Sequence, residues 1–321
     1  MGECGLYLGI DVGSVSTNII VIDRDLTVLE KYYIRTQGRP IQILKESLMK
    51  LSSNLPLNSK ISGVGCTGSG RELAGAIVGA DVVKNEITAH GIAALTFLPD
   101  TNTVIEIGGQ DSKIIIIRNG IITDFAMNTV CAAGTGSFLD RQASRLNIPI
   151  DEFGKLATES KSPVRIAGRC AVFAESDMIH KQQMGHEIAD IVGGLCIALV
   201  RNYLNNVGKG KKILPRVVFQ GGVAANRGIK NAFESMLNTE ITVPENYDVM
   251  GALGAAILAK DEVDSTNSTK FRGFARLKDD FVSTSFECDG CPNMCEIVEI
   301  KVGSQIVARW GDRCGKWTSA Q

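Results

Sequence analysis

Two stretches of this chain repeat one pattern, and the repeat limits the folds that the chain can adopt. GIDVGSVSTNIIVID (9–23) and IEIGGQDSKIIII (105–117) each consist of an apolar strand, an acidic residue, a glycine turn and a second strand. The wider segments 6–34 and 102–128 continue the same order, and Asn119-Gly120 is typical of a hairpin turn. The sequence therefore predicts two related α/β lobes.

The rest of the chain supplies helices and two more buried strands. Strands are predicted at 61–68 and 214–222, each of which runs into a glycine turn. The spacing of apolar residues predicts helices over 40–53, 86–96, 134–146, 174–182, 186–206, 226–237 and 248–260. The last helix is rich in small residues, so we expect another element to pack closely against it.

The expected domain organisation follows from this order. DEVDSTNSTK (261–270) is polar and has no periodicity, which is typical of a linker. We therefore expect a first lobe at 5–98, completed by a helix at about 248–262, a second lobe at 99–247, a linker at 263–285 and a Cys-rich tail at 286–321.

Composition and charge exclude several classes of function. The formal net charge is −1 and aromatic residues make up 6% of the chain, which argues against nucleic acid as a partner. The chain has no run of about 18 apolar residues, so no membrane-spanning helix is predicted. The N-terminus MGECGLYLGI has no basic or long apolar signal region, so we expect a cytoplasmic protein.

The repeated turns have the chemistry of a phosphate site. Backbone N–H groups and hydroxyls of such a turn bind phosphate oxygens, and Asp11 and Glu106 stand where Mg²⁺ or its waters would be held. VVFQGG (217–222) adds a buried strand that ends in a glycine pair, which suits close approach of an adenosine. The chain has no GxxxxGK[ST] motif, so a P-loop is excluded.

Together these three elements resemble the actin, Hsp70 and sugar-kinase ATPase superfamily, whose fold has two ribonuclease-H-like lobes with ATP between them. The resemblance implies that Asp11 holds Mg²⁺ through water, that Glu106 is the acid of the second lobe and that Gln110 orients the hydrolytic water. It implies phosphate contacts from Gly13, Ser14, Ser16, Thr17, Gly108 and Gly109. Gly221, Gly222, Val223 and Asn226 would flank the adenosine, with Gly251 packed nearby.

Two cysteines stand just before predicted helices. Cys131 precedes Gly134-Thr135-Gly136, and Cys170 lies in AGRCAVFAESDMI (167–179). A helix N-terminus stabilises a thiolate, and a [4Fe–4S] cluster requires four cysteinates. One chain offers two at these positions, so a symmetric dimer would supply four.

NTVCAAGTGSFLD and GRCAVFAESDMI, placed between the phosphate turns and FQGGVAAN, resemble the activators of 2-hydroxyacyl-CoA dehydratases, the BadF/BadG/BcrA/BcrD ATPase family. The resemblance covers about residues 5–262. It implies a homodimer with one [4Fe–4S] cluster ligated by Cys131 and Cys170 of each subunit. It also places Gly134, Thr135 and Gly136 near the nucleotide, so that one segment would couple ATP to the cluster.

The activity implied by this resemblance is electron donation driven by ATP hydrolysis, under anaerobic conditions. The partner would be an iron–sulfur enzyme such as a 2-hydroxyacyl-CoA dehydratase, a benzoyl-CoA-type reductase or a double-cubane protein. A ferredoxin or flavodoxin would supply the electron.

The tail has its own cysteine cluster, with Cys288, Cys291, Cys295 and Cys314. A Cys-x₂-Cys pair with two further cysteines indicates a metal site, and the spacing leaves zinc and iron–sulfur equally open. Cys4, Cys66 and Cys196 lack such a grouping and are interpreted as thiols without ligands. His90, His180 and His186 are interpreted as surface or cap residues.

Two other functions fit the same fold. A sugar or small-metabolite kinase would need a catalytic base and a polar substrate pocket, and it would leave the cysteine pair unexplained. An ATP-driven binding module in the manner of Hsp70 would contain no iron.

Overall fold

The computed structural model describes residues 5–56, 59–128 and 131–318, so Cys4 lies outside the described residues. The chain divides into two compact units. Unit 1 comprises Met1–Ala89 and Gly251–Gln321, and unit 2 comprises His90–Met250. Each is built around its own sheet and its own apolar core.

The sheet of unit 1 has five strands in the order β3-β2-β1-β4-β5. β1 pairs antiparallel with β2 and parallel with β4, and β2 pairs antiparallel with β3. β1 and β2 are almost continuously buried because helices cover the sheet. The bounds are β1 (Gly5–Val12), β2 (Ser16–Ile22), β3 (Val28–Arg35), β4 (Lys60–Thr67) and β5 (Val82–Val83).

The sheet of unit 2 repeats this topology strand for strand. Its order is β10-β9-β6-β7-β8, with β6, β7 and β8 antiparallel and with β9 and β10 parallel to β6. The bounds are β6 (Thr103–Ile107), β7 (Ser112–Arg118), β8 (Ile121–Asn128), β9 (Val217–Gln220) and β10 (Ile241–Thr242). The prediction of two related, ribonuclease-H-like lobes is confirmed.

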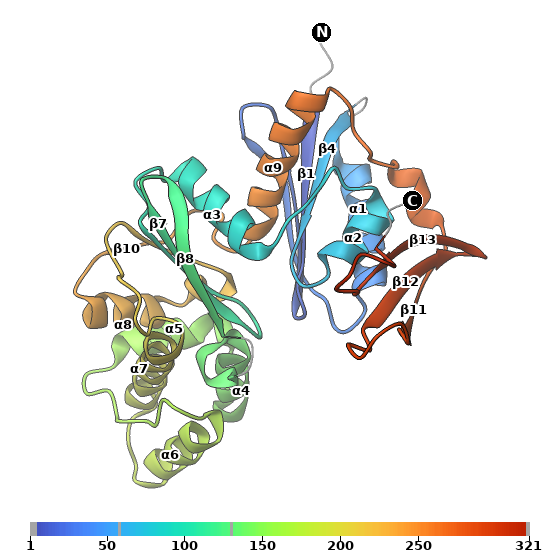
Figure 1. Cartoon of the computed structure of the whole chain (residues 1–321). Helices are drawn as coiled ribbons and strands as arrows, with labels where there is room; N and C mark the ends of the chain where they lie inside the picture. The colour runs from blue at the N-terminus through green and yellow to red at the C-terminus, as the bar shows by residue number, and fades with distance from the viewer. Residues whose placement is uncertain (1–4, 57–58, 129–130, 319–321) are drawn as a thin grey trace. The chain divides into compact units, whose positions relative to one another are not determined.

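Helix α9 (Met250–Thr266) lies along the sheet of unit 1, beside β1 and β4 (Figure 1). The approach is so close that a Cβ on Gly9 or Gly65 would run into the backbone of the helix. The small residues of α9 and the strand glycines therefore serve one contact, as predicted from the composition of this helix. The other helices of unit 1 are α1 (Pro40–Asn54) and α2 (Arg71–Val78), and α3 (Glu86–Phe97) crosses the division between the units.

Unit 2 gathers its helices around α7 (Ile188–Asn206). α7 is the one helix among the described residues whose length and composition would allow a membrane span. Leu195, Leu199 and Tyr203 of this helix are fully buried in the unit's core, so packing accounts for its apolar character. The other helical segments are η1 (Ala132–Gly134), α4 (Gly136–Leu146), α5 (Ile150–Glu159), α6 (Ala171–Gln183), η2 (Gly222–Ala225) and α8 (Arg227–Leu237).

The C-terminal segment is part of unit 1. A short helix, η3 (Phe274–Lys278), and a three-stranded sheet pack on this unit beside α1 and α2 (Figure 1). Leu277, Phe281 and Ile300 enter the same core cluster as β1 and β4. The strands are β11 (Phe281–Glu287), β12 (Glu296–Val302) and β13 (Gln305–Trp310).

The segment 263–285, predicted as a linker, has more structure than its polarity indicates. Its first residues complete α9, and its last begin β11. Between them, Lys270 N and Thr269 Oγ1 donate to the carboxylate of Asp81, and Arg272 N donates to Val78 O. These long-range hydrogen bonds hold the segment against unit 1.

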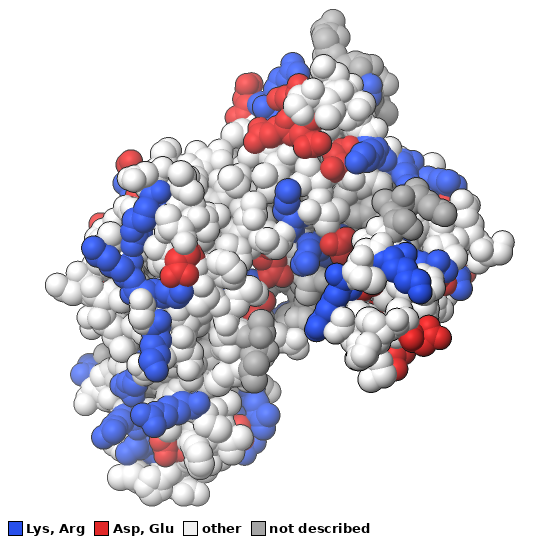
Figure 2. Space-filling model, in the orientation of Figure 1, with Lys and Arg blue, Asp and Glu red and all other residues white. Residues whose placement is uncertain are grey.

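Both acidic and basic side chains occur on the visible face of each unit (Figure 2), in keeping with the net charge of −1. The predicted helices are present, but α2 and α5 were not predicted. α2 has eight residues and α5 has ten, so both are short, although the apolar residues of each recur at helical spacing.

Candidate functional site: strand-end acids, glycine turns and a cysteine pair

In unit 1, three polar side chains form a row across the sheet where β1 ends. Asp11 on β1 pairs with Asn18 on β2 and with Thr67 on β4, so all three side chains share one face. Asn18 Oδ1 and Thr67 Oγ1 are buried and have no hydrogen-bond partner among the described residues. Two orphaned oxygens beside a carboxylate make an oxygen-only donor set, which fits Mg²⁺ or its waters.

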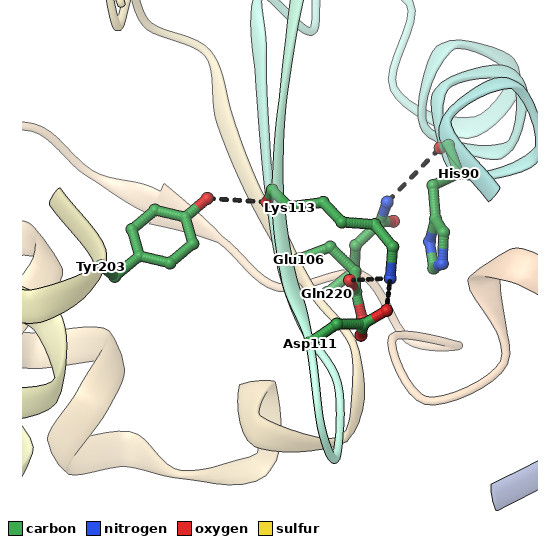
Figure 3. A network of polar contacts seen from close by, with 6 residues as sticks. All are labelled: His90, Glu106, Asp111, Lys113, Tyr203 and Gln220. Atoms are coloured by element: carbon green, nitrogen blue, oxygen red, sulfur yellow. Dashed lines mark hydrogen bonds and ion pairs between the residues drawn. The ribbon is translucent and has the colours of Figure 1, made fainter. Parts of the chain in front are cut away.

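The equivalent row of unit 2 carries different chemistry. Glu106 on β6 pairs with Lys113 on β7 and with Gln220 on β9. Lys113 Nζ lies 3.0 Å from Glu106 Oε2 and 2.9 Å from Asp111 Oδ2 (Figure 3). The Lys113 and Glu106 side chains are each only 4% exposed, so this acid has a buried cationic partner.

His90 and Gln220 continue this polar group (Figure 3). Gln220 Nε2 donates to His90 O at 3.4 Å, while Gln220 Oε1 and His90 Nδ1 are buried and have no hydrogen-bond partner in the part of the chain that the structure describes. Burial, with the nearby charge of Lys113, lowers the pKa of His90 to about 3. The imidazole is therefore neutral near pH 7. The prediction that His90 is a surface or cap residue is wrong, because α3 turns it inward (6% exposed).

The two glycine turns share one backbone geometry. Gly13 N donates to Ser16 O at 2.8 Å, and Gly108 N donates to Asp111 O at 3.1 Å. Ser14 and Gln110, near the tips of these turns, are exposed. Tight turns of this kind leave further N–H groups available to an anion.

Thr17 occupies a different place from the rest of its turn. It is fully buried, and its hydroxyl lies 3.1 Å from the hydroxyl of Thr36. Thr36 also donates to Gly13 O at 3.1 Å and, through its backbone N–H, to Val15 O at 2.8 Å. The two threonines therefore brace the turn from behind, and Thr36 was not predicted from the sequence.

A glycine stands behind each acid. Gly68 follows β4 with φ +92°, and Gly221 follows β9 with φ +89°, a region that favours glycine. A Cβ on Gly68 would meet the Asp11 carboxylate, and a Cβ on Gly221 would lie 2.7 Å from Glu106 Oε1. The duplication therefore extends to single residues outside the repeated sequence motif.

In unit 2 the glycine turn is bonded to the start of α4. Gly108 O accepts from Gly136 N at 2.9 Å, and Gly109 O accepts from both Ser137 N (2.7 Å) and Ser137 Oγ (2.6 Å). A Cβ on Gly136 would lie 3.1 Å from Val223 Cγ2. The structure thus brings together the turn at 108–110, the segment at 134–137 and the turn at 221–223.

Other predicted binding residues support this region from within. Thr135 is fully buried, and its hydroxyl donates to Ala132 O at 2.8 Å, while Gly134 is buried beside it. Asn226 caps α8, since its Oδ1 accepts from Ile229 N at 3.0 Å. Gly222 is partly exposed. Gly251 is buried in the first turn of α9, in unit 1.

The cysteines Cys131 and Cys170 are both half-buried, and one residue of α7 contacts the segments that carry them. Asn202 Nδ2 donates to Gly168 O at 2.5 Å and lies 3.9 Å from Cys131 Sγ. Asn128 holds Cys131 through two hydrogen bonds, to its N–H (2.9 Å) and from its own amide to Cys131 O (2.8 Å). Cys170 is the N-cap residue of α6.

The first turn of α6 exposes apolar side chains beside Cys170. Val172 is 69% exposed and Phe173 66%, although both follow the cysteine closely. Met184, at the other end of this helix, is 58% exposed. An apolar surface next to a half-buried thiol fits an interface better than open water.

The tail cysteines lie around the loop between β11 and β12. Cys288 Sγ accepts from Gly290 N at 3.5 Å and from Trp317 Nε1 at 3.2 Å, and these hydrogen bonds lower the pKa of this thiol. Cys288 N donates to Cys295 O at 2.8 Å, while Cys291 and Cys314 are exposed. Within 5–56, 59–128 and 131–318, no three His, Cys, Asp or Glu side chains form a group that could hold a metal ion.

The remaining described thiols are buried. Burial raises the pKa of Cys66 far above its ordinary value and raises that of Cys196 to about 12. Both are therefore poor metal ligands and poor nucleophiles near neutral pH. Lys113 and Asp111 were missed, although a lysine directly before the four isoleucines of a buried strand, β7, is an unusual residue that could have been noticed.

Comparison with known proteins agrees with the geometry of these sites. The two duplicated lobes define an actin/Hsp70/sugar-kinase-like ATPase fold. The chain belongs to the BadF/BadG/BcrA/BcrD ATPase family, whose sequence pattern matches residues 8–259. The match ends inside α9, so the tail lies outside it.

Three relatives illustrate the similarity. The (R)-2-hydroxyglutaryl-CoA dehydratase activating ATPase of Acidaminococcus fermentans is 35% identical over 256 residues, 78% of this chain and 96% of the relative. A benzoyl-CoA reductase subunit of Thauera aromatica is 30% identical, over 78% of this chain and 91% of the relative. The structure of the activator of the 2-hydroxyisocaproyl-CoA dehydratase from Clostridium difficile, with bound ADPNP, is 33% identical with a TM-score of 0.74, over 82% and 97% of the two chains.

Proposed function

We propose that this chain is an ATP-hydrolysing electron donor that reduces a partner iron–sulfur enzyme. Its cluster would be a [4Fe–4S] cluster held between two copies of the chain. The partner would be a 2-hydroxyacyl-CoA dehydratase, a benzoyl-CoA-type reductase or a double-cubane protein. Membership of the ATPase family and the similarity to dehydratase activators and to a reductase subunit support this proposal.

The observation that carries the proposal is a path in unit 2 made of hydrogen bonds and short backbone segments. The carbonyls of Gly108 and Gly109 accept from the first residues of α4, and η1 joins this helix to Cys131. Asn202 then links the segment of Cys131 to the segment that leads to Cys170. A phosphate at the turn would thereby reach both cysteines through short, rigid contacts.

The residues fit the cofactors they would hold. Asp11, with Asn18 and Thr67, supplies oxygen ligands for Mg²⁺ or its waters, and Gln110 is exposed at the tip of its turn to orient a water. Cys131 and Cys170 supply two of the four thiolates of a [4Fe–4S] cluster, so each subunit would provide half the ligand set. When bound, the cluster supplies one-electron transfer at low potential.

A homodimer would also cover exposed apolar surface. Val172 and Phe173 extend from the helix that Cys170 caps, and pairing across a two-fold axis would bury both copies of each. A dimer of this kind would work in the cytoplasm, where thiols stay reduced, and would take electrons from a ferredoxin or flavodoxin.

The deciding experiment measures iron and acid-labile sulfide per dimer in protein purified without oxygen. Cys131→Ser and Cys170→Ser should each lose about four irons per dimer relative to wild type, and any metal that remains would belong to the tail. Cys66→Ala, which alters a buried thiol outside this segment, is the matched control. No iron in wild type after anaerobic reconstitution would reject the electron donor and leave a kinase or a binding module.

For the tail, the proposal assigns a second metal, zinc or iron–sulfur, to Cys288, Cys291, Cys295 and Cys314. The two N–H groups directed at Cys288 Sγ support this assignment, because such donors stabilise metal-bound thiolates. Binding would require the exposed Cys291 and Cys314 to move inward. Metal content in a Cys131→Ser background, with and without Cys291→Ser, identifies this metal separately, and metal that is absent from both proteins rejects it.

A further inference from the structure

Lys113 sits between two carboxylates of very different exposure. Glu106 is 4% exposed, whereas Asp111, on the glycine turn, is 32% exposed (Figure 3). The two N–O distances are almost equal, 3.0 and 2.9 Å. The ammonium group is therefore shared between one carboxylate inside the unit and one at its surface.

This group carries one positive and two negative charges. A buried ion pair of this kind is weak evidence for stability, because desolvation offsets much of the attraction. The equivalent position in unit 1 is Asn18, so the fold itself does not require a lysine here. A reason for keeping the charge must come from what binds at the turn.

Two neighbouring groups have buried polar atoms that water or a ligand could complete. His90 Nδ1 and Gln220 Oε1 are buried without a hydrogen bond to any described residue, and both side chains lie in the same polar group as Lys113 (Figure 3). Tyr203 OH donates to Lys113 O at 2.7 Å and fixes the strand, so the flexible stem of the lysine is the part that can move. Native interiors seldom leave such atoms unpaired unless water or a ligand completes them.

We propose that Asp111 is a placeholder for the terminal phosphate of ATP. It holds Lys113 in the resting state, and the phosphate displaces it while the ion pair with Glu106 remains. No covalent bond changes in this step, since one anionic partner replaces another. The proposal rests on the ATPase function and adds the residue by which the chain distinguishes ATP from ADP.

The placeholder would also start the coupling to α4. Asp111 O accepts from Gly108 N, and Gly108 O accepts from Gly136 N, so the turn is bonded on both sides. Release of the Asp111 side chain would let this turn adjust, and its carbonyls would carry the first residues of α4 with them. ADP, which lacks the terminal phosphate, would leave Asp111 on Lys113.

The test is the ratio of affinities for Mg²⁺-ADPNP and Mg²⁺-ADP, measured by calorimetry on the full chain. Asp111→Asn removes the competing charge and should raise this ratio about tenfold, while Lys113→Met should bring it close to one. In the Lys113→Met background, Asp111→Asn should not change the affinity ratio further, because the ammonium group for which Asp111 competes is already gone.

Controls separate this idea from a structural role and from the ATPase function itself. Lys211→Met breaks the Lys211–Asp124 ion pair of the same unit (2.7 Å) and should leave the ratio unchanged. An Asp111→Asn protein whose ratio falls or stays constant overturns the placeholder while the ATPase function stands. A wild type that binds neither nucleotide overturns both.

Discussion

The polar rows of the two units have the same backbone arrangement but different charges. Asn18, Asp11 and Thr67 form a row whose single charge is an acid, and the amide and hydroxyl oxygens beside it have no partner among the described residues. In unit 2 the acid Glu106 is compensated by Lys113 across the strand pair. The two rows share their strand pairing but differ at all three paired positions, and Lys113 gives the row of unit 2 a cation that the row of unit 1 lacks.

The difference in charge between the two rows can be assigned to Lys113 because the glycine turns around the rows have nearly the same geometry. Gly13 and Gly108 donate to equivalent carbonyls, and Gly68 and Gly221 stand behind equivalent acids with nearly the same φ. Because the backbone is shared and the charge is not, the two acids should respond differently to the same substitution.

The largest effect is expected at Asp11. Asp11→Asn should lower Mg²⁺-dependent ATP hydrolysis by about 100-fold or more, because the row loses the carboxylate proposed to hold Mg²⁺ or its waters. Glu106→Gln should cost less, since Lys113 already neutralises this acid. Steady-state hydrolysis at several Mg²⁺ concentrations compares them, with Asp23→Asn in the exposed β2–β3 turn as the control. A larger loss at Glu106 than at Asp11 would break the comparison.

The tail should contribute to the stability of unit 1 alone, because its apolar residues pack into the core of that unit. Ile300 is fully buried against the core of unit 1, so Ile300→Ala should lower the free energy of unfolding by about 2–4 kcal/mol. Val282→Ala, at a 47% exposed position of the same sheet, should change it little. Hydrogen exchange of the backbone amides, measured at increasing urea concentrations, gives the unfolding of each unit separately. If Ile300→Ala left the exchange of β1 and β4 unaffected, the tail would be an independent module.

The glycines behind the acids test whether the scaffold is equivalent. Gly68→Ala and Gly221→Ala should each cost about 1–3 kcal/mol, because alanine is strained at positive φ and its Cβ would press on the acid. Gly120→Ala has a similar φ, +74°, with open space around the Cβ, and isolates the backbone strain. Chemical denaturation gives the three values. Tolerance of alanine at only one of the two sites would show that the scaffolds differ.

Just below neutral pH, the smallest effect is the one of pH, and it belongs to unit 2 alone, since the row of unit 1 has no histidine. The folded pKa of His90, about 3, lies below the ordinary value of 6.5. Unfolding therefore takes up a proton between these values, and stability falls as the pH falls through that window, by up to about 1.4 kcal/mol per pH unit. His90→Gln should flatten this dependence in unfolding experiments at several pH values. An unchanged slope would mean that other groups dominate.

Much of the fold was predictable because the signals are local. The repeat at 9–23 and 105–117 predicts two similar lobes, and the small residues of α9 predict a close contact that Gly9 and Gly65 supply. Asp11 and Glu106 were found because an acid at a strand end before a glycine turn is visible in one segment. Assigning Mg²⁺ and cluster roles to particular residues stays a prediction.

Other residues escaped notice because their partners are distant in sequence. Asn202 lies 71 residues from Cys131 and 34 from Gly168, and nothing within α7 marks it as the residue that contacts both segments. Thr36 was missed because its role is to brace a turn 19 residues earlier. Such roles depend on which elements meet.

The sequence by itself determined the duplicated strand–turn–strand order, the family and the residue types available for chemistry, because periodicity and turn residues act over a few positions. Only the tertiary structure decided that Lys113 pairs with Glu106, that His90 is buried and neutral, and that the tail joins the core of unit 1. The physical reason is that strand register, burial and packing are set by contacts between distant segments, and these contacts decide the charge state and the exposure of each side chain.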